Sequence, residues 1–458
     1  MDGPHTYSPT LYTMDLDYTG YGTLYLDILA NMTISGRLAR QRRKRPRKTS
    51  IKFTGEPYAT PKLAALYLTP NNNYKKSLRA RLGQRLLPSF AEKNYTNGEL
   101  FEHDLQLSWK SKIHVWIVPW CYHDDVTNAA VHDLFSHPWL SKSGRDHKIM
   151  LSYNVRKRLD VVNALSFIPE VLVASDVQYL CDHFLLNSAY FTSKSGRPVL
   201  VLAGLSQESI EDRRQLRSVT DTIRSIAREN SIGIFLLGDL VWSGILPQQR
   251  TLKDPFDLFD GIVPLNGMYE KIRNAATSEY PDALNTQATL DSFYDQQLRW
   301  RISAWQSNRA FIPTIIPGYN DRVTGNMNHP LARGMKGGGE SQGTFLVSCL
   351  DRAKHLLDPE LHDLIAINSF NNFLDDSQIY PVYGKRSELP KNLTDGLWYE
   401  GYGETFLDIL SGKVDKNATR KAYLTRKQKV LPLSKQDDWT NWCSARRRIL
   451  SKNRTRSR

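Results

Sequence analysis

Short apolar runs recur along the middle of the chain and alternate with amphipathic stretches. Runs of five to seven apolar, β-prone residues are typical of strands that are buried on both faces of a sheet. Stretches such as Ser206–Asn230 and Gly343–Leu357 instead place apolar residues at helical spacing. The predicted strands are, in chain order, Ile113–Pro119, Ile149–Tyr153, Pro198–Leu202, Ile232–Leu237, Gly261–Leu265, Phe311–Ile316 and Leu364–Ser369.

Strands that alternate with helices indicate an α/β fold in which helices cover a parallel sheet. Seven strands over about 300 residues predict a (β/α)8 barrel in which one strand is not recognised. A doubly wound open sheet is the alternative, but no G-x-G-x-x-G motif follows an early strand to support it.

The barrel is predicted to be one part of a longer arrangement. A polar, partly helical approach segment precedes it, and a basic tail follows it. The predicted divisions are a fragment at 1–36, a basic linker at 37–48, the approach segment at 49–104, the barrel at 105–412 and the tail at 413–458.

The fragment is defined by an internal similarity. "YTGYGTLYLDIL" (Tyr18–Leu29) and "YEGYGETFLDIL" (Tyr399–Leu410) agree at eight of twelve positions. Two copies this far apart do not form a solenoid. Residues 1–36 therefore resemble the C-terminal end of the same module.

The net charge of +14 is concentrated in two segments. Arg37–Lys48 contains eight basic residues and Arg446–Arg458 contains seven, with no acidic residue in either. Subtracting these 15 charges from +14 leaves the rest of the chain at −1. Binding of nucleic acid or another polyanion is thus predicted only through these segments, and a solvated linker and tail are the simpler interpretation.

Other classes of protein have little support in the sequence. No apolar run approaches the roughly 18 residues of a membrane-spanning helix, and the first residues lack the pattern of a signal peptide. The four cysteines show no C-x-x-C spacing, which excludes a zinc cluster of that type. We predict no metal and no cofactor.

The segments that follow the predicted strands are rich in Trp, Tyr, Asn and Asp. In a parallel barrel these segments meet at the carboxyl ends of the strands, where active sites lie. Aromatic faces and polar side chains together suit a carbohydrate groove. Trp120 and Tyr122 are candidates for a wall that stacks on sugar rings, and Tyr319 and Asp321 are candidates for lining the groove.

Several of these segments carry a resemblance to a known family. From Ile113 to Leu410 the chain resembles glycoside hydrolase family 99, the endo-alpha-mannosidase-like group. The stretches that carry it include "IHVWIVPW", "HKIMLSYNVRKRL", "FDGIVPLN", "FIPTIIPGYNDR" and "NSFNNFLDDSQIYPV". The resemblance implies a (β/α)8 barrel that acts on, or binds, glycans with alpha-linked mannose or a similar sugar, and a Golgi or secretory location by analogy only.

The family's final turn reads "NSFNEWHE". Its first Glu is understood to take a proton from the substrate's 2-hydroxyl, and its second to protonate the leaving oxygen. By position, Asn371 keeps the motif's Asn, Asn372 replaces the first Glu, and Asp375 stands at the acid position. Tyr380 replaces a later Glu of the family.

Two further positions follow from the same resemblance. The family's early Tyr-Glu pair, whose Glu shapes the sugar site, reads Tyr153-Asn154 here. Asp376 is a further candidate beside Asp375, although both could simply cap the turn, and adjacent residues on an extended turn point apart.

These replacements leave three hypotheses. An amide cannot accept a proton near neutral pH, so Asn372 cannot act as a general base, and Asp375 is one methylene shorter than Glu. The chain is a hydrolase with an altered acid–base pair, a non-catalytic glycan-binding descendant, or a polyanion-binding protein that acts through its basic segments.

Overall fold

The structure is a computed structural model of the 458-residue chain. The residues it describes all lie within one compact unit, Ala59–Tyr423. The basic segments, the fragment at 1–36 and the tail beyond residue 413 lie outside the described residues, so the predictions for them are not tested. The described residues are 61–69, 87–88, 96–121, 125–141, 146–155, 169–205, 213–240, 257–265, 284–322, 330–334, 342–383 and 401–413.

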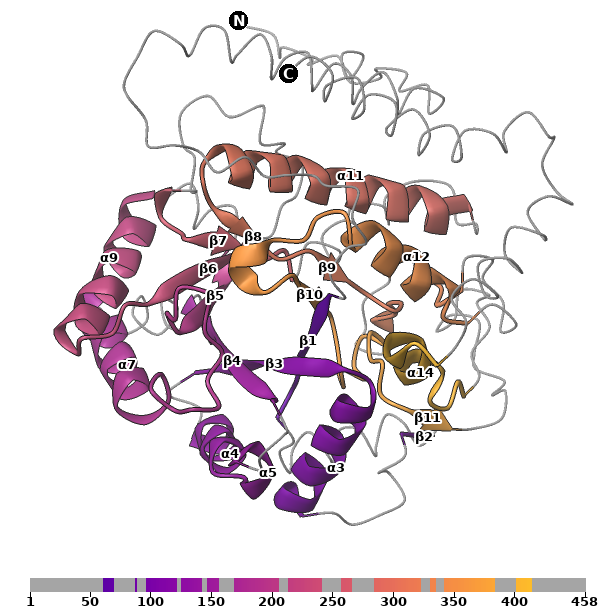
Figure 1. Ribbon diagram of the computed structural model, residues 1–458, viewed down its shortest axis with the longest axis horizontal. Helices are drawn as coiled ribbons and strands as arrows, with labels where there is room; N and C mark the ends of the chain where they lie inside the picture. Colours follow the sequence, from indigo (N-terminus) through magenta and orange to yellow (C-terminus); the bar gives the residue numbers. More distant parts are fainter. Residues whose placement is uncertain are drawn as a thin grey trace, which may run out of the picture. The chain divides into compact units, whose positions relative to one another are not determined.

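A parallel sheet forms the centre of this unit, and helices surround it (Figure 1). The order of the strands around the sheet is β8-β7-β6-β5-β4-β3-β1-β10-β9, and every named pair is parallel. The strands are β1 (Lys62–Leu66), β3 (Ile113–Trp120), β4 (Lys148–Asn154), β5 (Val199–Leu205), β6 (Phe235–Leu240), β7 (Gly261–Ile262), β8 (Ala310–Phe311), β9 (Thr314–Ile315) and β10 (Leu364–Ile367).

The two ends of this order meet, which closes the sheet into a barrel. β8 pairs with β7, and β9 pairs with β10, yet only Ile312 and Pro313 separate β8 from β9. The predicted strand Phe311–Ile316 is therefore two short strands, each serving a different neighbour. The (β/α)8 barrel predicted from the sequence is confirmed.

The strand that the sequence did not reveal is β1, which pairs with both β3 and β10. It lies within the predicted approach segment, so the barrel begins before residue 105. Its sequence, Lys-Leu-Ala-Ala-Leu, contains no β-branched or aromatic residue, and Ala and Leu favour helices. Its identity as a strand depends on the two neighbouring strands that bond to it.

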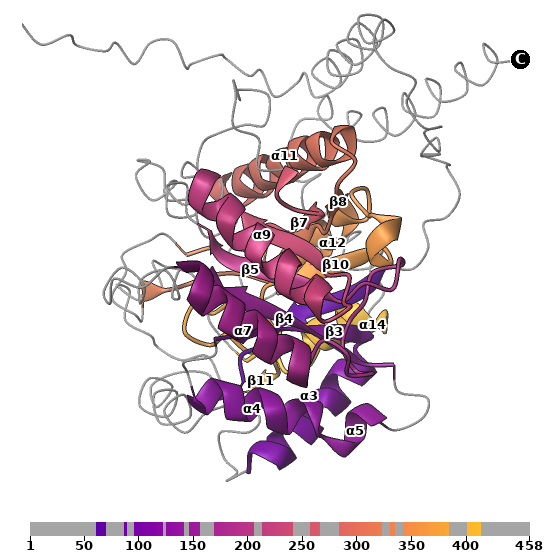
Figure 2. The same ribbon diagram turned by 90° about the vertical axis from the view of Figure 1, so that its left-hand side faces the viewer.

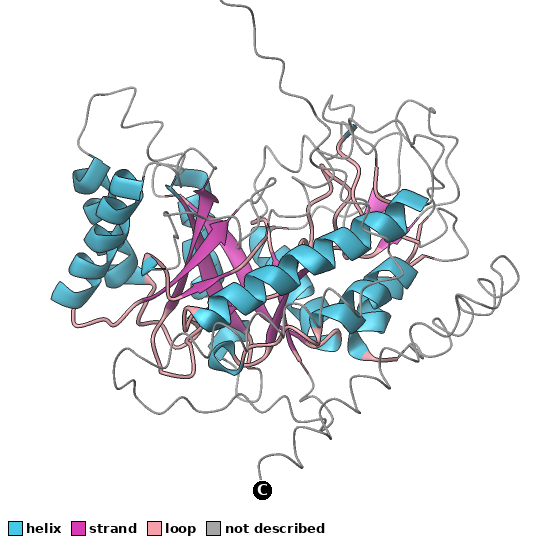
Figure 3. Cartoon of the chain, turned by 90° about the horizontal axis from the view of Figure 1, so that it is seen from above, coloured by secondary structure: helices cyan, strands magenta, loops and turns pink. Residues whose placement is uncertain are grey.

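Helices connect successive strands and cover the outside of the barrel (Figure 2 and Figure 3). In α9, Leu216, Val219, Ile223 and Ala227 recur at spacings of three and four and are all buried. The helices are α3 (Asn97–Lys110), α4 (Asp125–Phe135), α5 (Pro138–Ser141), α7 (Pro169–His183), α9 (Arg213–Glu229), α11 (Leu284–Gln306), α12 (Thr344–Ala353) and α14 (Thr405–Ser411). A 3-10 helix, η8 (Pro359–Leu361), precedes β10, and β2 (Leu87–Pro88) pairs with β11 (Val382–Tyr383).

Alternate residues of each strand divide between two buried clusters. Residues such as Ala64, Val115, Met150 and Leu237 pack together inside the barrel, in a cluster to which the named α-helices contribute nothing. Their neighbours along the strands, such as Trp116, pack outward against the helices. The direction of a strand side chain therefore decides whether it can face the barrel mouth.

A side-chain amide completes the hydrogen bonding where β9 begins. The Gln297 Nε2 atom donates to the Thr314 carbonyl oxygen at 2.9 Å, and the Thr314 amide donates to Gln297 Oε1 at 2.8 Å. Both residues are buried. Gln297, from α11, thus takes the place of a neighbouring strand at this position.

Replacing Gln297 with Ala leaves two buried backbone groups without these partners. We expect Gln297→Ala to lower the free energy of unfolding by about 1–3 kcal/mol. Gln306→Ala, at the exposed end of the same helix, is the matched control and should change it by about 0.5 kcal/mol or less. Urea denaturation of the two variants measures both values. Equal effects would contradict the role assigned to Gln297.

Besides Gln297, the buried side chain of His147, just before β4, should affect the stability of the fold. Its ring packs edge-on against Trp116, with ring centroids 4.9 Å apart. Burial lowers the pKa of His147 from its ordinary 6.5 to about 3. The folded protein therefore keeps this imidazole neutral over a pH range in which the unfolded chain binds a proton.

Because the unfolded state binds more protons between pH 6.5 and 3, stability should fall as the pH falls through this range. The contribution of one such group is about 1.4 kcal/mol per pH unit. We expect His147→Gln to flatten the pH dependence of the unfolding free energy by about this slope below pH 6. An unchanged slope in urea titrations at pH 6 and pH 5 would show that His147 is protonated in the folded state.

Candidate active site

The turn after β10 lies at the carboxyl ends of the strands. Backbone hydrogen bonds continue from β10 into it, from the Asn368 amide to the Ile315 carbonyl at 2.9 Å and from the Phe370 amide to the Leu66 carbonyl at 2.8 Å. These bonds anchor the turn to β9 on one side and to β1 on the other. The sequence from Asn368 onward is therefore at the barrel mouth, as predicted.

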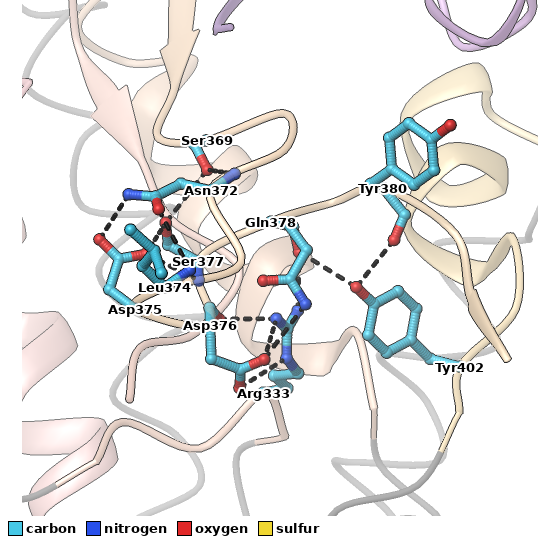
Figure 4. Close-up of polar contacts among 10 residues, drawn as sticks. All are labelled: Arg333, Ser369, Asn372, Leu374, Asp375, Asp376, Ser377, Gln378, Tyr380 and Tyr402. Carbon is cyan, nitrogen blue, oxygen red and sulfur yellow. Dashed lines mark hydrogen bonds and ion pairs between the residues drawn. The ribbon is translucent and has the colours of Figure 1, made fainter. Parts of the chain in front are cut away.

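Asn372 and Asp375 face each other within this turn (Figure 4). The Asn372 Nδ2 atom donates to Asp375 Oδ2 at 2.7 Å. Both side chains are half-buried. The two positions singled out from the sequence thus form one hydrogen-bonded pair.

Further donors from Ser377 point at the same carboxylate. Its backbone amide and its hydroxyl donate to Asp375 Oδ1, at 3.2 Å and 2.7 Å. All three hydrogen bonds, including the one from Asn372, are donated to the carboxylate and stabilise an acceptor. The Ser377 contacts also close the turn in the way that an Asp side chain caps a loop.

Asp376 points away from this pair, and its carboxylate contacts Arg333 (Figure 4). Arg333 Nη2 lies 3.0 Å from Asp376 Oδ1 and Nε lies 3.3 Å from Oδ2. The same guanidinium donates to the backbone carbonyls of Asp376 at 2.6 Å and Gln378 at 2.9 Å. Asp376, predicted as a substrate-binding residue, therefore has Arg333 as an ion-pair partner.

Arg333 is buried and is enclosed by aromatic rings from a third segment. Its guanidinium carbon lies 4.8 Å from the Tyr402 ring centroid and 5.1 Å from that of Phe406. The Tyr402 hydroxyl donates to the Tyr380 carbonyl at 2.8 Å. Gly318 also leaves room for Arg333, since a Cβ there would come within 2.6 Å of Arg333 Cγ. We call Arg333 and its partners Asp376, Gln378, Tyr402 and Phe406 the arginine clamp.

Tyr319 and Asp321 lie beside the same turn. The Tyr319 hydroxyl donates to Asp321 Oδ2 at 2.8 Å, and both side chains are buried. The Asn320 amide between them donates to the Asp375 carbonyl at 2.6 Å. The two segments that the sequence predicted to line the mouth are therefore joined through their backbones.

Two predicted sugar-site residues point outward into the layer between sheet and helices. Trp120 is 1 % exposed and donates through Nε1 to Asn128 Oδ1 of α4 at 3.0 Å. Tyr153 is fully buried and donates to Asp176 Oδ2 of α7 at 2.7 Å. Strand alternation thus directs Trp120 and Tyr153, the predicted sugar-stacking and sugar-site residues, away from the mouth.

Asn371 also has a structural role in place of the predicted substrate contact. Its Nδ2 atom donates to the Leu68 carbonyl, and its Oδ1 atom accepts from the Leu68 amide, both at 2.8 Å. The side chain is buried. Asn371 thereby pairs with the chain beyond the end of β1, as Gln297 does at β9.

Two inward-facing polar residues complete the described part of the mouth. Asn154 ends β4 and follows the inward-facing Ser152 by two residues, so it faces inward. Asp239 lies between the outward-facing residues 238 and 240 of β6 and is fully buried. The sequence analysis did not single out Asp239, which lies two residues beyond the predicted strand Ile232–Leu237. Tyr122 lies outside the described residues.

Arg333 and Ser377 were also missed by sequence reasoning. Arg333 lies in a Gly-rich stretch 43 residues before its partner Asp376, and no local pattern signals such a contact. Within the described residues, no group of three or more His, Cys, Asp or Glu side chains is arranged to hold a metal, and no helix is long and apolar enough to cross a membrane.

The arginine clamp should matter for stability. Removing one partner of a buried ion pair leaves the other buried and unpaired, so Arg333→Met should lower the free energy of unfolding by about 3–5 kcal/mol. Arg217→Met is the control, because Arg217 forms a similarly short ion pair with Asp257 in which both side chains are nearly half exposed. That loss should be about 1 kcal/mol or less. If chemical denaturation showed an equally small loss of unfolding free energy in both variants, the stabilising role of the arginine clamp would be contradicted.

Comparisons with known proteins agree with this architecture. Solved structures of the GH99 endo-alpha-mannosidase from Bacteroides thetaiotaomicron match the chain at 17 % and 16 % identity, with TM-scores of 0.50 and 0.51. The matches cover 80 % and 79 % of this chain, and 100 % and 98 % of the bacterial chains. One of these structures is a complex with bis-tris-propane.

Other comparisons are negative. No protein-family model matches the chain, and no curated protein matches it. The resemblance found in the sequence is confirmed at the level of the fold: this chain has the (β/α)8 barrel of the GH99 endo-alpha-mannosidases.

Proposed function

We propose that this chain binds alpha-linked, mannose-type glycans at the carboxyl end of its barrel and has lost the acid–base pair needed to hydrolyse them. The fold shared with endo-alpha-mannosidases supports the type of ligand. The observation that supports the loss of hydrolysis is the 2.7 Å hydrogen bond from the Asn372 amide to the Asp375 carboxylate.

This hydrogen bond joins the two positions at which the related hydrolases carry the base and the acid. Hydrolysis by two carboxyl groups needs one that accepts a proton and one that donates it, in environments that separate their pKa values. Asn372 has no accessible proton-accepting form, and its Nδ2 atom already donates to Asp375. The pair is therefore a donor and an acceptor, with no base.

The acid position is also altered. A group that donates a proton to a leaving oxygen must present an O–H to it, whereas Asp375 accepts hydrogen bonds from Asn372 and Ser377. Its side chain is short and turned toward its own loop. A displacement of about 1 Å can cost about 100-fold in rate. Asp375 is better suited to hold the turn than to protonate a glycoside.

The surroundings of the pair support retained binding. The turn is bonded to β1 and β9, to Asn320, and through Asp376 to the arginine clamp. A preorganised turn at the barrel mouth, with half-buried polar side chains, suits recognition of a polar ligand. We therefore place the glycan beside Asn372, Asp375 and Asn154, with Tyr319 and Asp321 supporting them, and leave out Trp120, Tyr153, Asn371 and Asp376.

Restoring the pair tests the proposed loss. We expect the unaltered chain to show saturable binding of alpha-linked mannosides without hydrolysis, and Asn372→Glu with Asp375→Glu to gain hydrolysis. Because each acid or base contributes about 10²–10⁴ in rate, the double variant should exceed both single variants by at least about 100-fold. Release of reducing sugar and calorimetric titration measure the two properties.

Asp239 provides the control for the opposite result. Efficient hydrolysis by the unaltered chain would overturn the proposed loss, and its disappearance in Asp239→Asn would identify the carboxylate of β6 as the missing base. Absence of binding to every alpha-linked mannoside tested would instead overturn the glycan ligand.

A further inference from the structure

The sequence around α14 occurs twice in this chain. Tyr399–Leu410 includes all of α14 except its last residue, and Tyr18–Leu29 repeats this stretch with eight of twelve positions identical. The first copy lies outside the described residues, whereas the second is described from Gly401 onward. The contacts of the second copy show which of its residues pack against the rest of the barrel.

Its aromatic residues enclose Arg333. The Tyr402 and Phe406 rings lie over the guanidinium, and the Tyr402 hydroxyl donates to the backbone carbonyls of Gln378 and Tyr380, at 3.3 Å and 2.8 Å. We call the surface formed by Arg333, Gly343, Gln378 and Tyr380 the α14 seat.

The remaining contacts are equally specific to this seat. Ile409 packs so closely on Gly343 that a Cβ at Gly343 would clash with its Cδ1 atom. The Gly403 amide donates to the Val382 carbonyl at 2.9 Å, and Gly403 has a φ of +52°, a conformation that favours glycine. Recognition therefore depends on a Tyr-Gly pair, an aromatic residue and an Ile at fixed spacing.

The first copy keeps these contact residues. Tyr21 and Gly22 correspond to Tyr402 and Gly403, and Ile28 corresponds to Ile409. Tyr25 replaces Phe406 and keeps an aromatic ring.

The two copies differ at four of the twelve positions. Thr23 stands at the position of the exposed Glu404, and Leu24 replaces Thr405, whose Cγ2 atom would lie 3.6 Å from a Cβ at Gly343. The counterparts of Tyr402, Gly403 and Ile409, which contact the seat, are identical in the first copy.

We propose that residues 18–29 of one copy of this chain occupy the α14 seat of a second copy. Each chain carries two sequences suited to the seat, and the described residues contain one seat. Exchange of equivalent elements between copies is a low-cost route to association, because the incoming segment remakes the contacts that the outgoing one gives up. This association does not depend on the glycan, and it uses a face of the barrel formed by Arg333 and α12.

A peptide tests the fit directly. Phe406→Ala in the full-length chain loosens the resident segment, and a fluorescent peptide of residues 15–32 then reports on the seat. We expect saturable binding that weakens about tenfold or more when Tyr21→Ala and Tyr25→Ala are introduced into the peptide. The control peptide carries Thr23→Ala, at the position of the exposed Glu404, and should bind as well as the original. Equal binding by all three peptides, or binding by none, overturns the proposal.

A second measurement uses the otherwise unaltered chain, so it does not depend on the fold of Phe406→Ala. The photoreactive residue p-benzoylphenylalanine replaces Tyr25, and light and heavy isotope-labelled chains are mixed. We expect crosslinks between light and heavy chains to peptides that contain Arg333 or Gly343, and none when the probe replaces Tyr12. Crosslinks only within one chain, or only outside the seat, overturn the second copy as the partner.

Discussion

The buried guanidinium of Arg333 is the interaction on which the mouth of this barrel depends. It contacts the turn after β10 through Asp376 and Gln378, and it is covered by Tyr402 and Phe406 near α14. The Arg333 guanidinium therefore joins its own segment to two others that are far apart in the sequence, the turn after β10 and the segment at α14. A buried charge without partners is costly, so these stretches are stable mainly in each other's presence. The turn that carries Asn372 and Asp375 is therefore held by this cation as well as by its backbone bonds to β1 and β9.

Sequence periodicity predicted most of the barrel because its strands are buried on both faces and therefore read as apolar runs. β3, β4 and β5 lie within three residues of their predicted bounds at every end, since each contains an uninterrupted apolar run. β1 escaped because Ala and Leu carry no strand signal, and Phe311–Ile316 divided in two because its halves bond to different neighbours. Both departures depend on pairing between distant segments, which no local window contains.

The site was predicted less well, for a reason of geometry. The motif register correctly brought Asn372 and Asp375 together, and Tyr319 and Asp321 to the same side of the barrel. The direction of side chains was harder to predict: Trp120 ends β3 and Tyr153 lies one residue before the end of β4, yet both face the helices. A shift of one residue in a strand reverses the face, so residue type and position along a strand do not by themselves place a side chain in a site.

Two amide side chains form hydrogen bonds with backbone groups of the sheet at places where no neighbouring strand reaches them. Gln297 pairs with Thr314, and Asn371 pairs with Leu68, each through one donated and one accepted hydrogen bond. Side chains from α11 and from the turn after β10 thus complete the hydrogen bonding at these two places, without longer strands. Loops at the mouth can therefore change length and chemistry while the ladder beneath them stays whole, so a new ligand preference could evolve here without rebuilding the scaffold.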